Sequence, residues 1–360
     1  MKVVVAPDKF AGTMSAARAG DAIAAGWRSV RPDDEVMVVP MADGGAGTLD
    51  VVAFAVPDAD EMTVEVADAR GRARTARWLR LPDGRAVIEA AEACGLAWLD
   101  ETQRDPLLAT SYGVGQLLDA VERTGHAEIL IGLGGSATSD GGAGMALALG
   151  HRLLRADGNG VKVGARYLVD LDHLELAART GPPITIVSDV DNPLLGARGA
   201  VAVFAPQKGA GADDLPVLER ALAHFADVVE RDVPGGPWRD LGGAGAAGGL
   251  GFGLMAFCGA SMASGAAAVA DLVGLYGHIR GAEVVIAGEG RLDDQTLSGK
   301  TPAFIASAAR DAGARVLAVA GQVKGRGAEL FDDVAVLGAG GLDRPVELTR
   351  ERAADLASRV

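Results

Sequence analysis

The sequence is poor in cysteine, histidine and aromatic residues, and each shortage excludes a class of protein. Its 360 residues include two cysteines, Cys94 and Cys258, too few for a disulfide framework, and no Cys/His spacing typical of a zinc site is present. None of the five histidines lies in a glycine-rich loop and there is no G-x-S-x-G elbow, so a nucleophilic triad is not supported. Aromatic residues, at 4%, are too few for stacking on nucleic-acid bases. We therefore expect a protein of the reducing cytoplasm.

Positive charge and long hydrophobic runs are also scarce. Lys and Arg total 34 against 48 Asp and Glu, a formal charge of −14 that repels phosphate backbones and anionic lipid. The apolar run Val3–Ala6 is too short for a signal-peptide core. Residues 241–270 carry no charge, but nine of them are glycine, which favours a buried loop and a small-residue helix over a membrane span. We expect no nucleic-acid partner and no membrane; a homo-oligomer is left open.

Glycine, in contrast, is abundant: 51 of the 360 residues, about 14% and roughly double the usual share, occur in short runs. Short β-branched runs recur between these glycines, and each is followed by a glycine-rich turn. The runs are Val3–Ala6, Glu35–Pro40, Ile129–Ile131, Ile184–Val187, Val284–Ala287, Val316–Ala320 and Val334–Leu337. Continuous apolar runs are typical of strands covered by helices on both faces, so the pattern predicts an α/β fold with largely parallel sheets.

One region departs from this pattern and suggests two domains. Residues 61–90 alternate apolar and polar positions between hairpin signals, which predicts a small antiparallel meander. We expect a second α/β domain to begin there, at residues 56–280, inserted into a discontinuous α/β domain formed by residues 1–55 and 281–360. The Pro- and Gly-rich segment Val233–Gly236 is interpreted as a linker.

Five of the predicted strands end in residues with binding or catalytic chemistry. In open α/β sheets, ligands bind beyond the carboxyl ends of the strands, so these residues are candidates for one site. They are Asp8 with Lys9, Asp43 with Gly44 and Gly45, the loop Gly134–Gly142, Asp189 with Asp191, and Glu289 with Arg291 and Asp293. Asp and Gly are also good turn formers, which would explain any one of these ends but not all five.

The loop Gly134–Gly142 is the most specific of the five. Gly134 and Gly135 let backbone N–H groups approach an oxyanion, the hydroxyls of Ser136, Thr138 and Ser139 add donors, and a helix N terminus follows. These features predict a phosphate cradle. The same segment matches the dinucleotide pattern G-x-G-x-x-A, although a convincing acidic partner about 20 residues later is missing.

Two further segments suggest how a phosphorylated ligand could be held. Asp189 and Asp191 place two carboxylates two residues apart in a turn, which suits Mg²⁺ bound together with substrate phosphates. Ser298–Thr301 resembles the end of a Walker A loop but lacks its first glycine, so it is not a P-loop; Lys300 is still a candidate phosphate contact.

Several of these segments resemble signature motifs of the bacterial type 1 glycerate kinase family, in the same order from the first strand to about Gly321. They are Ala6–Phe10, Pro40–Gly45, Gly134–Gly142, Ser188–Leu194, Phe204–Gly209, Gly288–Asp293 and Gly299–Lys300. Ala11 and Ala46 depart from the family, which commonly has Lys and Glu there. The resemblance implies two α/β domains, one inserted into the other, with the active site in the cleft between them.

The activity that the resemblance implies is transfer of the γ-phosphoryl group of ATP to a hydroxyl of D-glycerate, with Mg²⁺ as cofactor and phosphoglycerate and ADP as products. The 2-phosphate is favoured over the 3-phosphate. Such a reaction needs positioning and charge neutralisation more than covalent chemistry. The cations that could neutralise glycerate or phosphate are Lys9, Lys208, Arg291 and Lys300.

The general base stays open between four carboxylates that follow strands: Asp8, Asp43, Asp189 and Asp293. Our candidate catalytic residues are Asp8, Lys9, Asp189 and Asp293, with Asp189 and Asp191 for the metal. Asp43 and Glu289 join the loop residues and the cations as candidate binding groups. Because neighbouring residues of an extended chain point to opposite sides, we expect Asp8 and Lys9 to serve different groups.

Two other functions remain as alternatives. An NAD(P)-linked dehydrogenase would rest on the G-x-G-x-x-A match, and a small-acid sensor would bind the same ligands without releasing ADP.

Overall fold

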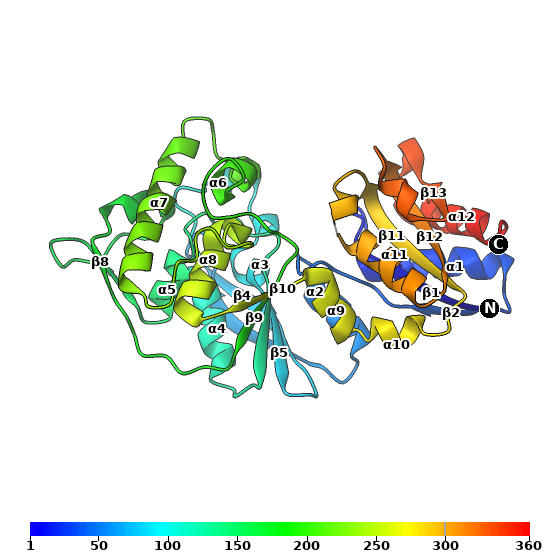
Figure 1. Cartoon of the computed structure of the whole chain (residues 1–360), viewed down its shortest axis with the longest axis horizontal. Helices are drawn as coiled ribbons and strands as arrows, with labels where there is room; N and C mark the ends of the chain where they lie inside the picture. Colours follow the sequence, from blue (N-terminus) through cyan, green and yellow to red (C-terminus); the bar gives the residue numbers. More distant parts are fainter. Residues whose placement is uncertain (299) are drawn as a thin grey trace. The chain divides into compact units, whose positions relative to one another are not determined.

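The computed structural model describes residues 1–298 and 300–360. By their internal contacts these residues form two compact units, shown in Figure 1. Unit 1 comprises Met1–Asp43, Gly47–Pro57 and Ser264–Val360, and unit 2 comprises Gly44–Ala46 and Asp58–Ala263. The fold is mixed α/β with mostly parallel strands, as the sequence predicted.

Unit 1 is built on a parallel sheet of five strands in the order β13-β12-β11-β1-β2. Its strands are β1 (Lys2–Pro7), β2 (Glu35–Val38), β11 (Val284–Leu292), β12 (Arg315–Val323) and β13 (Asp333–Val336). Its helices are α1 (Ala16–Val30), α2 (Thr48–Ala55), α9 (Gly265–Leu272), α10 (Leu275–Ile279), α11 (Thr301–Asp311) and α12 (Pro345–Ala357), with 3₁₀ turns at Thr296–Ser298, Gly327–Leu330 and Gly338–Gly340.

Both faces of the unit 1 sheet are covered by helices. Alternate residues of β1, such as Val3 and Val5, pack with Ile23 and Trp27 of α1 and with α12. Helix α11 packs against β11 and β12. Burial on both faces explains why the strands have continuous apolar sequences.

The two units differ from the predicted domains at residues 44–46, 56–57 and 264–280. Residues 264–280, which the sequence analysis placed in the inserted domain, belong to unit 1, because α9 packs against α2 and α11. Nothing in the α9 sequence indicates its packing partners. The predicted division into 1–55 plus 281–360 and 56–280 stays a prediction.

Unit 2 contains a mixed sheet of six strands in the order β10-β9-β6-β5-β4-β3. Strands β5, β6, β9 and β10 run parallel, whereas β3, β4 and β5 form the antiparallel meander expected at 61–90. The strands are β3 (Asp60–Ala67), β4 (Ala73–Arg80), β5 (Arg85–Glu89), β6 (Glu128–Gly132), β9 (Ile184–Val187) and β10 (Ser261–Ala263), with a separate pair β7 (Arg152–Leu154) and β8 (His173–Glu175).

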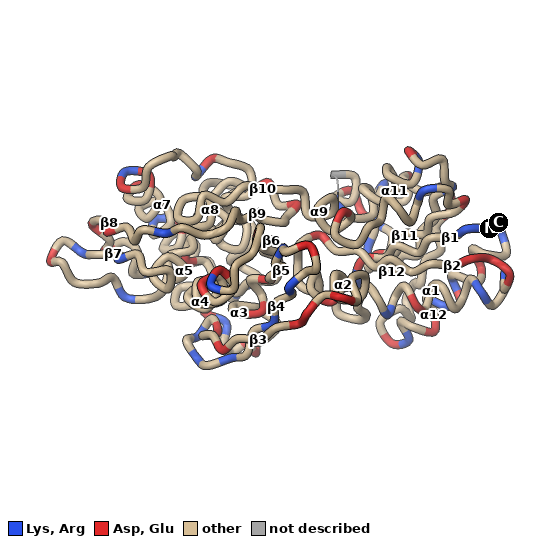
Figure 2. Tube along the Cα trace, turned by 90° about the horizontal axis from the view of Figure 1, so that it is seen from below, with Lys and Arg blue, Asp and Glu red and all other residues tan. Residues whose placement is uncertain are grey.

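The helices of unit 2 are α3 (Ala90–Cys94), α4 (Tyr112–Glu122), α5 (Ala143–Ala148), α6 (Ala200–Phe204), α7 (Leu215–Asp232) and α8 (Ala246–Cys258). Short 3₁₀ turns lie at Leu96–Trp98, Glu101–Gln103, Ala165–Asp170 and Pro206–Lys208. Figure 2 shows basic and acidic residues interspersed along the chain in both units.

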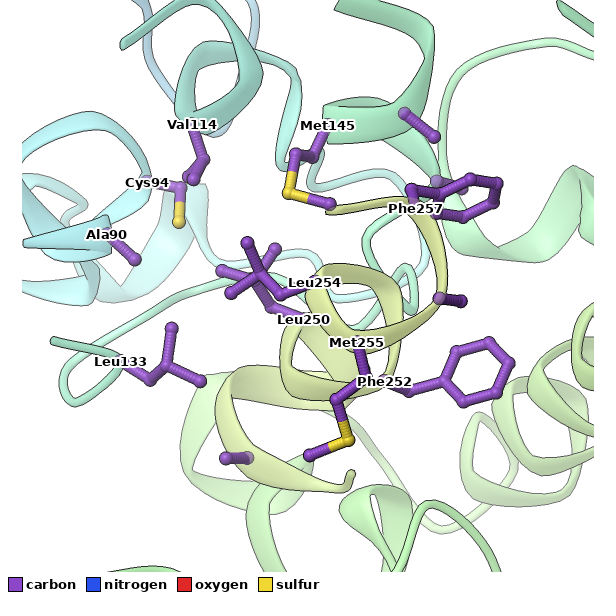
Figure 3. Packing of buried hydrophobic residues seen from close by; sticks show 14 of the residues in the cluster. Ala90, Cys94, Val114, Leu133, Met145, Leu250, Phe252, Leu254, Met255 and Phe257 are labelled. Carbon is purple, nitrogen blue, oxygen red and sulfur yellow. The ribbon is translucent and has the colours of Figure 1, made fainter. Parts of the chain in front are cut away.

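Helix α8 explains the charge-free stretch at 241–270. It is buried in unit 2, and Figure 3 shows its Leu250 and Leu254 side chains in the same cluster as Cys94, Val114 and Leu133. The prediction of a buried glycine-rich loop and helix is therefore confirmed. In the described part of the chain, no helix combines the length and apolar character needed to cross a bilayer.

Candidate functional site

Two groups of predicted site residues lie at the carboxyl ends of the strands, one in each unit, and each is described separately. In unit 1 the strand register brings two carboxylates together. Pro7 at the end of β1 pairs with Gly288 of β11, and the Asp8 amide donates to the Gly288 carbonyl at 2.8 Å. Asp8 and Glu289 are therefore neighbours on adjacent strands.

Lys9 joins these carboxylates to Asp43, which follows β2. Its Nζ lies 3.8 Å from Asp8 Oδ1 and 3.4 Å from Asp43 Oδ1, and its amide donates to Asp8 Oδ1 at 2.6 Å. The Lys9 side chain therefore lies against Asp8, beyond the end of β1 at Pro7, and the expectation that the two residues serve different groups stays a prediction. We call Asp8, Lys9, Asp43 and Glu289 the lysine-centred cluster.

Burial changes the protonation of this cluster. Burial raises the pKa of Asp8 to about 6, against the lowering effect of Lys9. Burial, with the charges of Asp8 and Asp43, raises the pKa of Glu289 to about 8. Burial acts to lower the pKa of Lys9, but Asp8 and Asp43 outweigh it and raise that pKa. Near neutral pH, Lys9 is charged, Asp8 is mostly ionised and Glu289 is mostly protonated.

The remaining candidates of unit 1 lie after the lysine-centred cluster in the chain. The Arg291 Nε lies 3.3 Å from Asp293 Oδ2, and Lys300 Nζ donates to Gln295 Oε1 at 3.0 Å. Asp293 also accepts from the Gln295 amide at 3.0 Å, so it forms a local turn. Gly299, which is part of the family resemblance, lies outside the described residues.

Strand β11 is longer than predicted. The sequence placed its end at Ala287, but pairing with β12 continues to Leu292, so Glu289 and Arg291 lie within the strand. Their side chains therefore share one face of the sheet. The glycines that suggested a turn instead permit close backbone packing: a Cβ on Gly321 would lie 2.4 Å from the Gly290 carbonyl oxygen.

In unit 2 the predicted phosphate cradle, Gly134–Gly142, follows β6, and we call residues 132–142 the anion loop. Its first glycines are required by contact with residues 44–46. A Cβ on Gly134 would lie 2.4 Å from Gly45 Cα, and a Cβ on Gly132 would lie 2.6 Å from the Gly44 oxygen. Gly135 has a φ of +81°, which favours glycine for conformational reasons.

A buried lysine holds the middle of the anion loop. Lys208, which is 2% exposed, donates to Ser136 Oγ at 3.2 Å and to the Thr138 carbonyl at 2.6 Å. Burial lowers its pKa to about 8 despite the opposing effects of Cys94 and Asp140. A charged ammonium so poorly hydrated interacts strongly with any anion that reaches it.

A cavity of about 130 Å³ gives access to this lysine. Gly134, Gly135, Ser136 and Lys208 line it, whereas Thr138 and Ser139 are fully buried and lie outside its lining. Of the three hydroxyls predicted to bind phosphate, Ser136 is the one that faces the cavity.

The glycine-rich start of α8 also lines this cavity, through Ala246 and Ala247. Ala247 has a φ of +53°, which is unfavourable for a residue with a Cβ and is often found at functional sites. This glycine-rich segment packs tightly on the anion loop, because a Cβ on Gly248 would lie 2.0 Å from the Thr138 carbonyl oxygen.

The helix N terminus proposed for phosphate is occupied by a side chain. Asp140 accepts hydrogen bonds from the amides of Gly142 and Gly144, both at 3.2 Å, and from the amide and hydroxyl of Ser111 at 2.8 and 3.0 Å. Burial raises its pKa, and these hydrogen bonds oppose the rise. A pyrophosphate at the start of α5 would meet this carboxyl, which removes the structural basis of the dinucleotide alternative. The sequence analysis missed this role, although an Asp before two glycines is an N-cap signal.

The proposed metal ligands follow β9 and are both exposed. Asp191 pairs with Arg198 at 3.1 Å, so its charge is already neutralised. Within residues 1–298 and 300–360, no three His, Cys, Asp or Glu side chains converge as a metal site. Magnesium commonly takes one or two carboxylates and completes its shell with substrate phosphates and water, so Asp189 and Asp191 as metal ligands stay a prediction.

These features define an α/β protein with a half-buried lysine, Lys9, after one strand and a buried lysine, Lys208, against the loop after another. The model of the glycerate kinase family matches residues 3–353. The chain is 40% identical over 328 residues to a glycerate kinase of Bacillus subtilis, covering 90% of this chain and 85% of that one. It is 39% identical over 352 residues to the glycerate 2-kinase of Escherichia coli, covering 95% and 89%. A crystal structure of a candidate glycerate kinase 2 from Salmonella typhimurium LT2 has a TM-score of 0.85 and 38% identity, covering 100% of this chain and 98% of that one.

The chain belongs to the glycerate kinase family and is an enzyme of the kinase class.

Proposed function

We propose that the chain transfers the γ-phosphoryl group of ATP to a hydroxyl of D-glycerate, forming 2-phosphoglycerate and ADP. The glycerate kinases to which it is similar support the substrate, and the name of the Escherichia coli relative supports the 2-position. The single observation that carries the chemistry is the lysine-centred cluster. It pairs a carboxylate suited to accept a hydroxyl proton with a lysine suited to bind an anion.

Asp8 is the general base in this proposal. Its pKa of about 6 lies close to neutral pH, so it is mostly ionised yet still accepts a proton. The proton of the glycerate hydroxyl passes to an Asp8 carboxylate oxygen as the hydroxyl oxygen bonds to the γ-phosphorus and the bond to ADP breaks. Lys9 neutralises the glycerate carboxylate or a transferring phosphoryl oxygen.

The anion loop and Lys208 bind the nucleotide phosphates in this proposal. Their cavity contains a buried ammonium and the Ser136 hydroxyl, which are suitable partners for phosphate oxygens. Magnesium bound at Asp189 would neutralise phosphate charge during transfer. The location of the active site in a cleft, as the resemblance implies, stays a prediction.

An assay of ADP release with and without D-glycerate tests this function. Phosphorus NMR of the product distinguishes the 2-phosphate from the 3-phosphate. Release of ADP that does not depend on glycerate, or no release at all, would contradict the proposal.

A further inference from the structure

The lysine-centred cluster contains more negative charge than an anion-binding site can easily accept. Asp8, Asp43 and Glu289 surround one ammonium, that of Lys9. If all three carboxyls were ionised, the cluster would have a net charge of −2 and would repel an anionic substrate. One carboxyl must be neutral for an anion to bind there at low cost.

The strand register identifies Glu289 as a close neighbour of Asp8. Glu289 follows Gly288 on β11 just as Asp8 follows Pro7 on β1, and Gly288 and Pro7 are paired. Side chains alternate along strands, so Asp8 and Glu289 point to the same face, which α11 covers. Two carboxyls in this arrangement do not readily ionise together.

The hydrogen bonding of Glu289 leaves a donor for a ligand. Among the described residues, its carboxyl accepts a single hydrogen bond, from the Gly290 amide to Oε1 at 3.0 Å. Oε2 takes part in no hydrogen bond in the described part of the chain, so a proton on this oxygen could be donated to a ligand.

We propose that Glu289 binds the acceptor substrate as a neutral carboxylic acid, donating its Oε2–H hydrogen bond to an anionic oxygen of that substrate. The proton stays on Glu289 throughout the reaction, whereas the hydroxyl proton passes to Asp8. This inference rests on the proposed function, because it assigns Glu289 to the binding of glycerate. The pKa of Glu289, raised to about 8 by burial and by Asp8 and Asp43, agrees with it.

The charged groups around Glu289 explain why ionisation of its carboxyl is unfavourable. From the segment after β1 come Asp8 and Lys9, and from the segment after β2 comes Asp43. On β11 itself, Arg291 shares the face of Glu289 and pairs with Asp293. On β12 its paired residue is Ala320, which has no charge. Ionisation of Glu289 would therefore place a second, partly buried carboxylate beside Asp8, and Lys9 is the cation that would oppose this cost.

This arrangement makes substrate binding dependent on a proton. With a pKa of about 8, Glu289 is mostly protonated at pH 7 and mostly ionised at pH 9. The KM for D-glycerate should therefore rise about tenfold between these pH values. Activity that depends on Asp8 should instead fall as the pH drops below about 6.

The test measures the KM for D-glycerate between pH 6.5 and 9.5 in the full-length wild type and in Glu289→Gln. Glutamine keeps a hydrogen-bond donor but cannot ionise, so the KM of this variant should change less than about twofold over the range. Glu283→Gln is the matched control, because Glu283 is exposed and lies just before β11. This control should keep the tenfold rise.

Calorimetry of D-glycerate binding in buffers of different ionisation enthalpy provides a second measurement on the wild type. At pH 8 we expect uptake of about half a proton per glycerate bound. No uptake, a KM that is flat with pH, or a tenfold rise that persists in Glu289→Gln would each overturn the inference while glycerate phosphorylation stands. A wild type that never releases ADP with glycerate would contradict the proposed function itself.

Discussion

Replacement of Lys208 by methionine tests whether this lysine binds a ligand or only stabilises the fold. Methionine is a flexible, apolar side chain that fills similar space without the charge. If Lys208 binds nucleotide phosphate, this variant should lose activity and keep its fold. If the lysine only holds the anion loop together, the variant should lose stability.

The change in stability follows from two opposing effects. Burial lowers the pKa of Lys208 from 10.5 to about 8, a difference worth about 3 kcal/mol. Because the unfolded chain binds this proton more tightly, stability falls as the pH drops from 10.5 to 8, and the full cost is present at pH 7. The substitution removes that cost but leaves the Thr138 carbonyl without its donor, a loss of about 1–3 kcal/mol. We expect the free energy of unfolding to stay unchanged or to rise by up to about 2 kcal/mol.

The change in activity should be much larger. Loss of one preorganised charge that contacts a reacting phosphate costs about 10²–10³ in turnover. The assay measures kcat and the KM for ATP by coupled ADP release, and urea denaturation gives the stability. Lys162→Met is the control, because Lys162 is an exposed lysine of the same unit that lies over the Tyr167 ring. Lys162→Met removes the same charge and should leave the kcat, the KM for ATP and the stability unchanged.

Normal kcat and KM in Lys208→Met would refute the phosphate-binding role. A loss of more than about 3 kcal/mol of stability with normal activity in the folded fraction would show that the lysine is structural.

Four further substitutions test other parts of the site. Asp189→Asn should lower activity about 100-fold if Asp189 binds the metal. Asp191→Asn removes an exposed ion pair with Arg198 and should change activity less than about threefold. Equal losses of activity in the two variants would contradict this distinction. Asp8→Asn should lower kcat by about 10²–10⁴. Because the pKa of Asp8 is raised in the folded state, its ionisation lowers the free energy of unfolding as the pH rises from about 4 to 6. Asp8→Asn should therefore be at least as stable as the wild type at pH 7. Normal turnover in this variant would exclude Asp8 as the general base. Gly134→Ala should destabilise the chain by about 1–3 kcal/mol, because its Cβ would overlap Gly45, and a melting temperature equal to that of the wild type would contradict the packing described.

Most of the fold could be predicted from local sequence. The apolar runs at 3–6, 129–131 and 184–187 became β1, β6 and β9, because strands buried on both faces need continuous hydrophobic side chains. The meander at 61–90 was also predicted, since one exposed face produces alternation. The end of β11 could not be predicted, because Gly288 and Gly290 suggest a turn until their close contacts with β1 and β12 are known.

The sequence predicted which residues form the candidate site better than it predicted how they are arranged. Strand ends identified Asp8, Lys9 and Asp43, and the family resemblance identified Lys208, but no sequence pattern shows that Lys9 folds back onto Asp8. The role of Asp140 was missed for a related reason. Its hydrogen bonds reach Ser111, 29 residues away in the chain, and such a contact follows only from the packing of α4 on α5.

The most direct test of the central claim is the rate of ADP release by the purified wild type, with ATP and Mg²⁺, in the presence and absence of D-glycerate. The proposed function predicts release that depends on D-glycerate and yields one phosphoglycerate per ADP, identified by phosphorus NMR as the 2-phosphate. ADP release at the same rate without glycerate, or no phosphoglycerate in the product, would contradict it.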